Sequence, residues 1–358
     1  MRCRLFGADI VLAALSLSAR SLYGQSTPVT PKQSTAEALV RRARQYSEAG
    51  ETVQAEELLQ KALASNPHYA SANIAMGSLL FQRRHWPEAM DHFEAVLEMD
   101  SGNAEARQGE EKAAVALALH QRSSGDSEGC LNTLERATSR APGDALLLTD
   151  LGVQAQVMGR LQTARDALNA ALTAAPDDLM ATYTLGRVEM DLQDFPAAER
   201  QFQAYLKRRP EDATAHYGLG RVYQMEQHAE AAAREFQTSI RLEPDQAESQ
   251  YQLGQIALDA GRTDEARTDF RQVLQRVPTH GGALTGLGML AYREKNYEEA
   301  EQSLSRAVAA SPDYQPAHYY YGLTLRRLGR QADAERELQL ATELASRQQG
   351  KAAPVGPS

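Results

Sequence analysis

Residues 211–244, EDATAHYGLGRVYQMEQHAEAAAREFQTSIRLEP, and residues 245–278, DQAESQYQLGQIALDAGRTDEARTDFRQVLQRVP, follow one 34-residue pattern. Each copy has Leu-Gly at its ninth and tenth positions, an alanine followed four residues later by phenylalanine, and a proline at its end. Apolar residues recur in each half at helical spacing, which predicts two amphipathic helices per copy. A fixed period of this length is typical of a solenoid of stacked helical hairpins.

The period extends well beyond these two copies. Prolines recur every 34 residues at Pro142, Pro176, Pro210, Pro244, Pro278 and Pro312. Ten residues after them stand Gly152, Gly186, Gly220, Gly254, Gly288 and Gly322, and twenty-two residues after them stand Ala164, Ala198, Ala232, Ala266, Ala300 and Ala334. Small residues at these two positions let a pair of helices cross closely, while the large apolar residue one turn later fills the space beside them.

An earlier part of the chain keeps the same register. Pro67 is followed by Gly77, Ala89 and Phe93 in the expected places. The next repeat carries seven extra residues within 102–124, and we predict that they lengthen its first helix. The chain therefore divides into nine repeats, numbered in order: 34–67, 68–101, 102–142, 143–176, 177–210, 211–244, 245–278, 279–312 and 313–346.

The order Leu-Gly, Ala-x-x-x-Phe and a closing proline resembles the tetratricopeptide repeat family. The resemblance covers nearly all of the chain after residue 33 and implies an all-α, right-handed superhelical solenoid of antiparallel helix pairs. In this family the first helices of successive repeats line a concave surface that binds partners as extended peptides or single helices. The resemblance thus implies a scaffold or adaptor for other proteins.

Three positions in each first helix are expected to face that concave surface: three residues before the repeat glycine, one after it and four after it. In the middle repeats these are Tyr183, Arg187 and Met190, then Tyr217, Arg221 and Gln224, then Tyr251, Gln255 and Leu258; the ninth repeat adds Tyr319 and Arg326. Tyrosine and arginine often anchor protein interfaces. The alternative interpretation is that the tyrosines pack locally, as in the general pattern of the family.

The sequence offers no pattern for catalysis, a metal or a cofactor. None of its eight histidines stands in a metal-ligand spacing, and we expect them to be solvated or to cap helices. No nucleophile, base and orienting group can be assembled, so we predict a non-catalytic protein. The net charge of −9 argues against general nucleic-acid binding.

The amino-terminal 24 residues have the layout of a secretory signal peptide: Arg2 and Arg4, an apolar run, and then Ser21 to Gly24. We therefore expect a periplasmic or secreted protein of the bacterial envelope with no stable membrane span once the leader is removed. A cytoplasmic adaptor is the alternative if the leader is not a signal. Residues 25–33 are predicted to form a linker and residues 347–358 a disordered tail.

Self-assembly is a second functional hypothesis. No polar helix follows the ninth repeat, and its last helix carries Leu338, Leu340, Ala341 and Leu344. Such an apolar end would pair with another copy of the chain and give a structural homo-oligomer.

Overall fold

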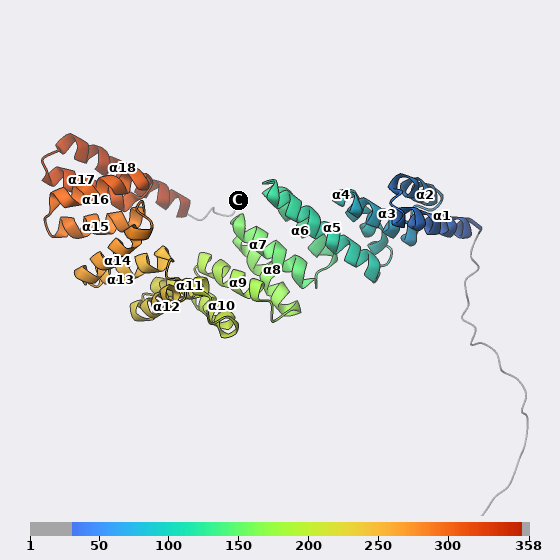
Figure 1. Cartoon of the computed structure of the whole chain (residues 1–358), viewed down its shortest axis with the longest axis horizontal. Coiled ribbons are helices and arrows are strands. Elements are labelled where there is room, and N and C mark those ends of the chain that lie inside the picture. Colours follow the sequence, from blue (N-terminus) through green and yellow to red (C-terminus); the bar gives the residue numbers. More distant parts are fainter. Residues whose placement is uncertain (1–30, 353–358) are drawn as a thin grey trace, which may run out of the picture. The chain divides into compact units, whose positions relative to one another are not determined.

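The computed structural model describes residues 31–352, which form helices joined by short turns, with no strand in that range (Figure 1). The helices are α1 (Pro31–Glu48), α2 (Thr52–Ser65), α3 (Ala70–Gln82), α4 (Trp86–Leu97), α5 (Ala104–Ser123), α6 (Ser127–Arg140), α7 (Ala145–Val157), α8 (Leu161–Ala174), α9 (Leu179–Asp191), α10 (Phe195–Arg208), α11 (Ala213–Met225), α12 (Ala229–Leu242), α13 (Ala247–Asp259), α14 (Thr263–Arg276), α15 (Gly281–Arg293), α16 (Tyr297–Ala310), α17 (Gln315–Arg327) and α18 (Gln331–Ala352). Each odd-numbered helix is the first helix of a repeat and each even-numbered helix the second. The predicted solenoid of antiparallel helix pairs is confirmed.

The chain divides into two compact parts at Ala113 and Ala114, within α5. The first part holds α1 to α4 and the start of α5, and the second holds the remainder through α18. Helix α5 has 20 residues, whereas α7 and α9 have 13 each. The predicted lengthening of the third repeat's first helix is therefore confirmed.

Within a repeat, the crossing of the two helices depends on the predicted glycine and alanine. A Cβ atom at Gly220 would lie 2.7 Å from the Phe236 ring, and one at Gly254 would lie 2.6 Å from the Phe270 ring. Ala232, one turn before Phe236, is fully buried. Larger side chains at these positions would push the two helices apart.

A second set of glycines, which sequence reasoning missed, packs one repeat onto the next. Gly218 lies two residues before the repeat glycine, and a Cβ atom there would lie 2.8 Å from the ring of Phe202 in the preceding repeat. Gly286 faces Phe270 and Gly109 faces Phe93 in the same way. Each of these three phenyl rings is therefore held between glycines of two successive first helices.

The turn inside each hairpin needs one residue in the left-handed region. Glycine occupies it at Gly159, Gly261 and Gly329, where φ is +72°, +71° and +78°. The equivalent residues Gln193 and Gln227 adopt φ of +62° and +63° without being glycine. These glutamines bear the steric cost that an L-residue has in this region.

In the second compact part, the first helices of neighbouring repeats contact each other, as α7 contacts α9, α13 contacts α15, and α15 contacts α17. Pairs of neighbouring second helices do not come as close among the described residues. The first helices therefore lie on the inner side of the curve, and the second helices form its outer face.

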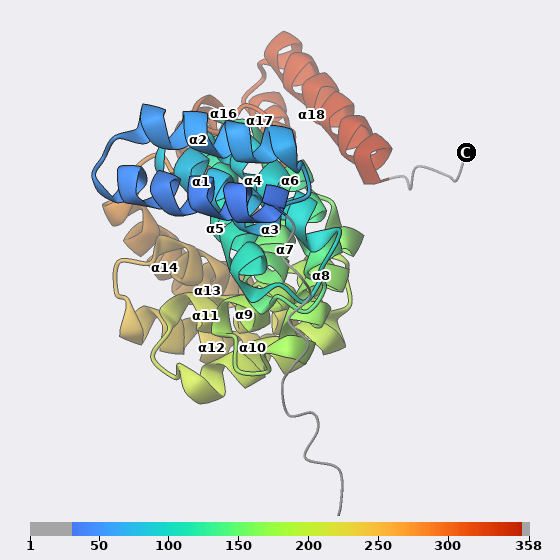
Figure 2. The ribbon, with the colours of Figure 1, turned by 90° about the vertical axis from the view of Figure 1, so that its right-hand side faces the viewer.

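The ends of the array differ from the predicted boundaries. Helix α1 begins at Pro31, within the predicted linker, and proline is well suited to a first helical position. Helix α18 continues to Ala352, past the predicted start of the tail at residue 347, and its last turns extend beyond α17 in Figure 2. No proline interrupts this segment before Pro354, so the helix can propagate. The predicted signal peptide lies outside the described residues.

The predicted apolar end of α18 is largely turned inward. Ala341 and Leu344 are 2% and 5% exposed, and Leu338 packs against Gly322 of α17. Of the four apolar residues Leu338, Leu340, Ala341 and Leu344, the first two are partly exposed and the last two are buried. No helix within residues 31–352 combines the length and the apolar character needed to cross a membrane.

Candidate peptide-binding surface

The candidate surface is the inner face of α9, α11 and α13, formed by Tyr183, Arg187, Met190, Tyr217, Arg221, Gln224, Tyr251 and Gln255. The structure brings these residues into register because they form one set per helix, three on α9, three on α11 and two on α13, at equivalent positions of 13-residue helices. Positions three and four residues apart share one side of a helix, so each set forms a stripe.

The three tyrosines are half-buried, and each packs on the phenylalanine of its own repeat. The ring centroids of Tyr183 and Phe202 are 5.8 Å apart with the rings at 76°, and those of Tyr217 and Phe236 are also 5.8 Å apart. Burial raises the pKa of the Tyr183 phenol, while the charge of Arg187 opposes that shift. The tyrosines therefore have the local packing role that was the alternative interpretation, with part of each ring still exposed.

Tyr251 is held more firmly than the other two tyrosines. Its ring lies 6.0 Å from Phe270 and 4.8 Å from His280, and a Cβ atom at Gly282 would lie 2.7 Å from it. Burial, followed by the neighbouring Tyr314 phenol, raises the pKa of Tyr251 above its ordinary value. This tyrosine mainly joins the seventh repeat to the eighth.

The two arginines have different surroundings. Arg187 is exposed and forms no ion pair with any side chain in the described range. Arg221 is half-buried: its Nη1 donates a hydrogen bond of 3.2 Å to the Tyr217 hydroxyl, and its Nε is buried with no hydrogen-bond partner. The Arg221 charge also helps to lower the pKa of Glu248, after the larger effect of the hydrogen bond between Glu248 and His280. Arg187 is therefore the arginine available to a partner.

The third position of the stripe is less exposed than predicted. Met190 is half-buried against the core around Phe202, and Gln224 and Gln255 are also half-buried. The prediction that Leu258 faces the surface is wrong, because Leu258 is 2% exposed and packs in the core that includes Leu290. In the ninth repeat Tyr319 is 43% exposed, as expected of the surface position.

A pocket of about 390 Å³ adjoins the candidate surface between α9 and α11. Tyr183 and Met180 line it, and Met180 is 60% exposed. On the other side, Tyr205 donates a hydrogen bond of 2.8 Å to Asp212. Burial, together with this bond, raises the pKa of Tyr205 to about 12.

Sequence reasoning missed Met180 and Tyr205. Met180 precedes Tyr183 by three residues, so extending the stripe by one turn would have found it. Tyr205 lies on α10, the second helix of the repeat, so the spacing of residues along α9 does not indicate it. The pocket joins an exposed thioether, two tyrosine rings and a carboxylate, which suits an amphipathic segment of a partner.

Five of the eight histidines follow the expectation of solvation or capping: His68, His85, His120 and His228 are exposed, and the fifth is His280. His280 caps α15, as expected. His216 and His318 instead bridge the two helices of their repeats, with Nδ1 lying 2.6 Å from carboxylate oxygens of Glu235 and Glu337. Their position, four residues before the repeat glycine, faces the second helix rather than solvent.

No cluster of three or more histidine, cysteine, aspartate or glutamate side chains able to hold a metal ion occurs in the part of the chain that the structure describes. Cys130 is buried at the repeat alanine position, and burial raises the pKa of its thiol. A thiol in such surroundings is a poor nucleophile.

Comparison with known proteins identifies the repeat. Two family models described as tetratricopeptide repeat match residues 46–109 and 115–178, and a run of overlapping matches covers 183–350. No curated protein matches the chain.

Several solved structures are similar to parts of the chain. The Cut9–Hcn1 hetero-tetramer of the APC/C is 16% identical with a TM-score of 0.53, over 88% of this chain and 61% of that chain, and it shows the fold. YrrB, titled a TPR protein with an unusual peptide-binding site, is 23% identical with a TM-score of 0.42, over 51% of this chain and 95% of its own. MamA from Desulfovibrio magneticus RS-1 is 23% identical with a TM-score of 0.44, over 47% of this chain and 96% of its own.

Proposed function

Because the chain belongs to the tetratricopeptide repeat family, we propose that it is a non-catalytic scaffold or adaptor that binds a polypeptide segment of another protein along the candidate surface. Proteins built from these repeats generally bind other proteins or peptides. The observation that carries the proposal is the combination on α9 of an exposed Met180, a partly exposed Tyr183 ring and an exposed, unpaired Arg187.

These three side chains offer complementary contacts. The Tyr183 ring is fixed by Phe202 and Tyr205, so little conformational entropy is lost when a partner packs on it. Met180 adds adaptable apolar area, and Arg187 can pair with a carboxylate of the partner. An extended peptide or a single helix lying across α9, α11 and α13 would make all three contacts.

We place this function in the bacterial envelope. The support is the signal-like order of Met1 to Gly24 in the sequence. Amino-terminal sequencing of the native protein tests the location: a mature chain that begins close to Gln25 supports export, and an intact Met1 supports the cytoplasmic alternative.

Affinity capture from a native extract tests the binding function. The wild type is compared with Arg187→Glu and with Arg200→Glu, which makes the same charge change at an exposed position on α10. We expect the wild type and Arg200→Glu to retain the same proteins. Arg187→Glu should not retain them. Retention of the same proteins by all three forms would show that binding occurs elsewhere.

A further inference from the structure

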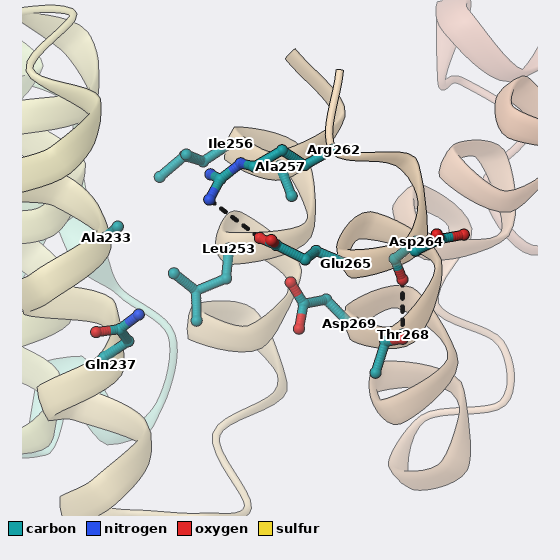
Figure 3. A pocket seen from close by; sticks show the side chains of 10 residues that line it. All are labelled: Ala233, Gln237, Leu253, Ile256, Ala257, Arg262, Asp264, Glu265, Thr268 and Asp269. Carbon is teal, nitrogen blue, oxygen red and sulfur yellow. Dashed lines mark hydrogen bonds and ion pairs between the residues drawn. The ribbon is translucent and has the colours of Figure 1, made fainter. Parts of the chain in front are cut away.

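A hollow of about 410 Å³ opens on the outer face, between α12 and α14 (Figure 3). Leu253, Ile256 and Ala257 of α13 form its floor. Ala233 and Gln237 of α12 form one wall, and Asp269 of α14 lies on the other. These floor residues are on the side of α13 opposite to Tyr251 and Gln255, so the hollow is separate from the candidate surface.

The cleft one repeat earlier shows which side chain fits such a space. There, Tyr223 of α11 stands where Ala257 stands in α13, since each lies three residues after the repeat glycine. The Tyr223 hydroxyl donates a hydrogen bond of 2.8 Å to Glu199 and accepts one of 3.2 Å from Gln203. The protein thus fills the equivalent cleft with a tyrosine of its own.

The sixth and seventh repeats keep only part of this arrangement. Gln237 is the equivalent of Gln203, whereas Ala233 replaces Glu199 and Ala257 replaces Tyr223. The amide that binds the phenol is therefore retained, and the phenol itself is missing.

In neighbouring clefts a long side chain stands at one or both of the positions that hold alanine in the hollow. Between the fourth and fifth repeats the same two positions hold Arg165 and Glu189, which form an ion pair of 2.6 Å. Between the seventh and eighth repeats Arg267 occupies the first position and pairs with Glu294 at 2.5 Å. A long side chain fills each of these clefts.

The rim of the hollow is acidic. Asp264, Glu265 and Asp269 line it, and the only arginine in the lining, Arg262, is already paired with Glu265 at 3.0 Å. Asp269 accepts a hydrogen bond of 2.6 Å from Gln250, and burial raises the pKa of its carboxyl. A hydroxyl donor, or a cation placed beside these carboxylates, would therefore be stabilised.

We infer that this hollow binds a tyrosine side chain of a partner polypeptide that carries arginine or lysine next to that tyrosine. The ring lies on Leu253, Ile256 and Ala257, as Tyr223 packs in its own cleft. The phenol hydroxyl accepts a hydrogen bond from Gln237 and donates one to Asp269. The flanking cation faces the acidic rim.

The peptide acetyl-Arg-Tyr-Arg-amide is the probe, and the methyl NMR signals of Ile256 and Ala257 are the readout. We expect saturable shifts with this peptide and roughly 10- to 100-fold weaker binding when phenylalanine replaces its tyrosine, as the loss of two hydrogen bonds implies. Acetyl-Glu-Tyr-Glu-amide should not bind. Absence of saturable shifts with the first peptide, or equal affinity for the tyrosine and phenylalanine peptides, would overturn the inference.

Two variants make the test specific to the hollow. Ala257→Tyr restores the pattern of Tyr223 and should abolish binding, whereas Ala309→Tyr adds a tyrosine at an exposed position on α16 and should leave it unchanged. Gln237 is exposed, so Gln237→Leu should not disturb the fold. This variant should bind the tyrosine peptide more weakly and bind the phenylalanine peptide as the wild type does. Undiminished binding to folded Ala257→Tyr would place the peptide elsewhere and refute the assignment.

Discussion

Gly186 and Gly218, on successive first helices, both face Phe202, and we expect substitution by alanine to have different effects at the two positions. A Cβ atom at Gly218 would lie 2.8 Å and 2.9 Å from the nearest two ring carbons of Phe202, closer than packed carbon atoms come. A Cβ atom at Gly186 would lie 3.3 Å from the Cβ atom of Gln201 and 3.4 Å from the same ring, close to ordinary contact. Phe202 is fully buried in a core with Leu219 and Val222, so its ring can move only if its neighbours also shift.

The expected energies follow from two effects. Alanine is favoured over glycine inside a helix by about 1 kcal/mol, and this gain applies to both variants. Overpacking a filled core costs about 1 to 3 kcal/mol, and this cost applies only to Gly218→Ala. We therefore expect Gly186→Ala to be neutral or up to about 1 kcal/mol more stable than the wild type, and Gly218→Ala to be up to about 2 kcal/mol less stable.

Urea unfolding followed by circular dichroism measures this difference, with the midpoints of the two variants compared under identical conditions. The difference between the variants should be about 1 to 3 kcal/mol. Equal midpoints for the two variants, or a midpoint for Gly186→Ala below that of Gly218→Ala, would refute the account of how successive repeats pack.

Four further substitutions test other parts of the structure. Ala232→Leu should overpack the helix crossing beside Phe236 and lower the free energy of unfolding by about 1 to 3 kcal/mol, so an unchanged melting temperature would contradict the assigned register. Gln193→Gly should remove the steric cost of a left-handed backbone conformation and stabilise the fold by about 0.5 to 1 kcal/mol, while Gly261→Gln should destabilise it by a similar amount. A calorimetric scan in which both variants shift the melting temperature in the same direction would exclude this explanation. Burial raises the pKa of Asp269 in the folded state, so the wild type gains stability as the pH falls from the folded pKa toward the unfolded value of about 3.9. Asp269→Asn should therefore be more stable than the wild type at neutral pH and lose that advantage in acid, and urea titrations in which the difference does not change with pH would count against it.

The sequence predicted the fold almost completely because the fold is set by a repeated local pattern. Each repeat contains its own glycine, alanine and closing proline, and the crossing of its two helices depends on residues within 34 positions of one another. The glycines that pack one repeat on the next, such as Gly218, were not recognised. They do not recur in every repeat: Gly109, Gly218 and Gly286 each follow a repeat that has phenylalanine, but Gln252 stands at this position after Phe236.

The candidate site was predicted less well, for two physical reasons. Helical periodicity gives the side of a helix, but burial also depends on the neighbouring repeat, and the seventh repeat's Leu258 is covered by the eighth. The period also gives no sign of a space left by missing side chains. The hollow above Ala257 becomes visible only when the side chains that fill the neighbouring clefts are compared.

Site-specific photo-crosslinking tests the central claim most directly. A photoreactive phenylalanine analogue is placed at position 187 on the candidate surface, and in a second form at the exposed position 200 on α10 of the same repeat. The account predicts that the form labelled at 187 crosslinks to a segment of another polypeptide in native extract and that the form labelled at 200 does not. Crosslinks from position 200 alone, or equal yields from both positions, would contradict binding along the inner face of α9, α11 and α13.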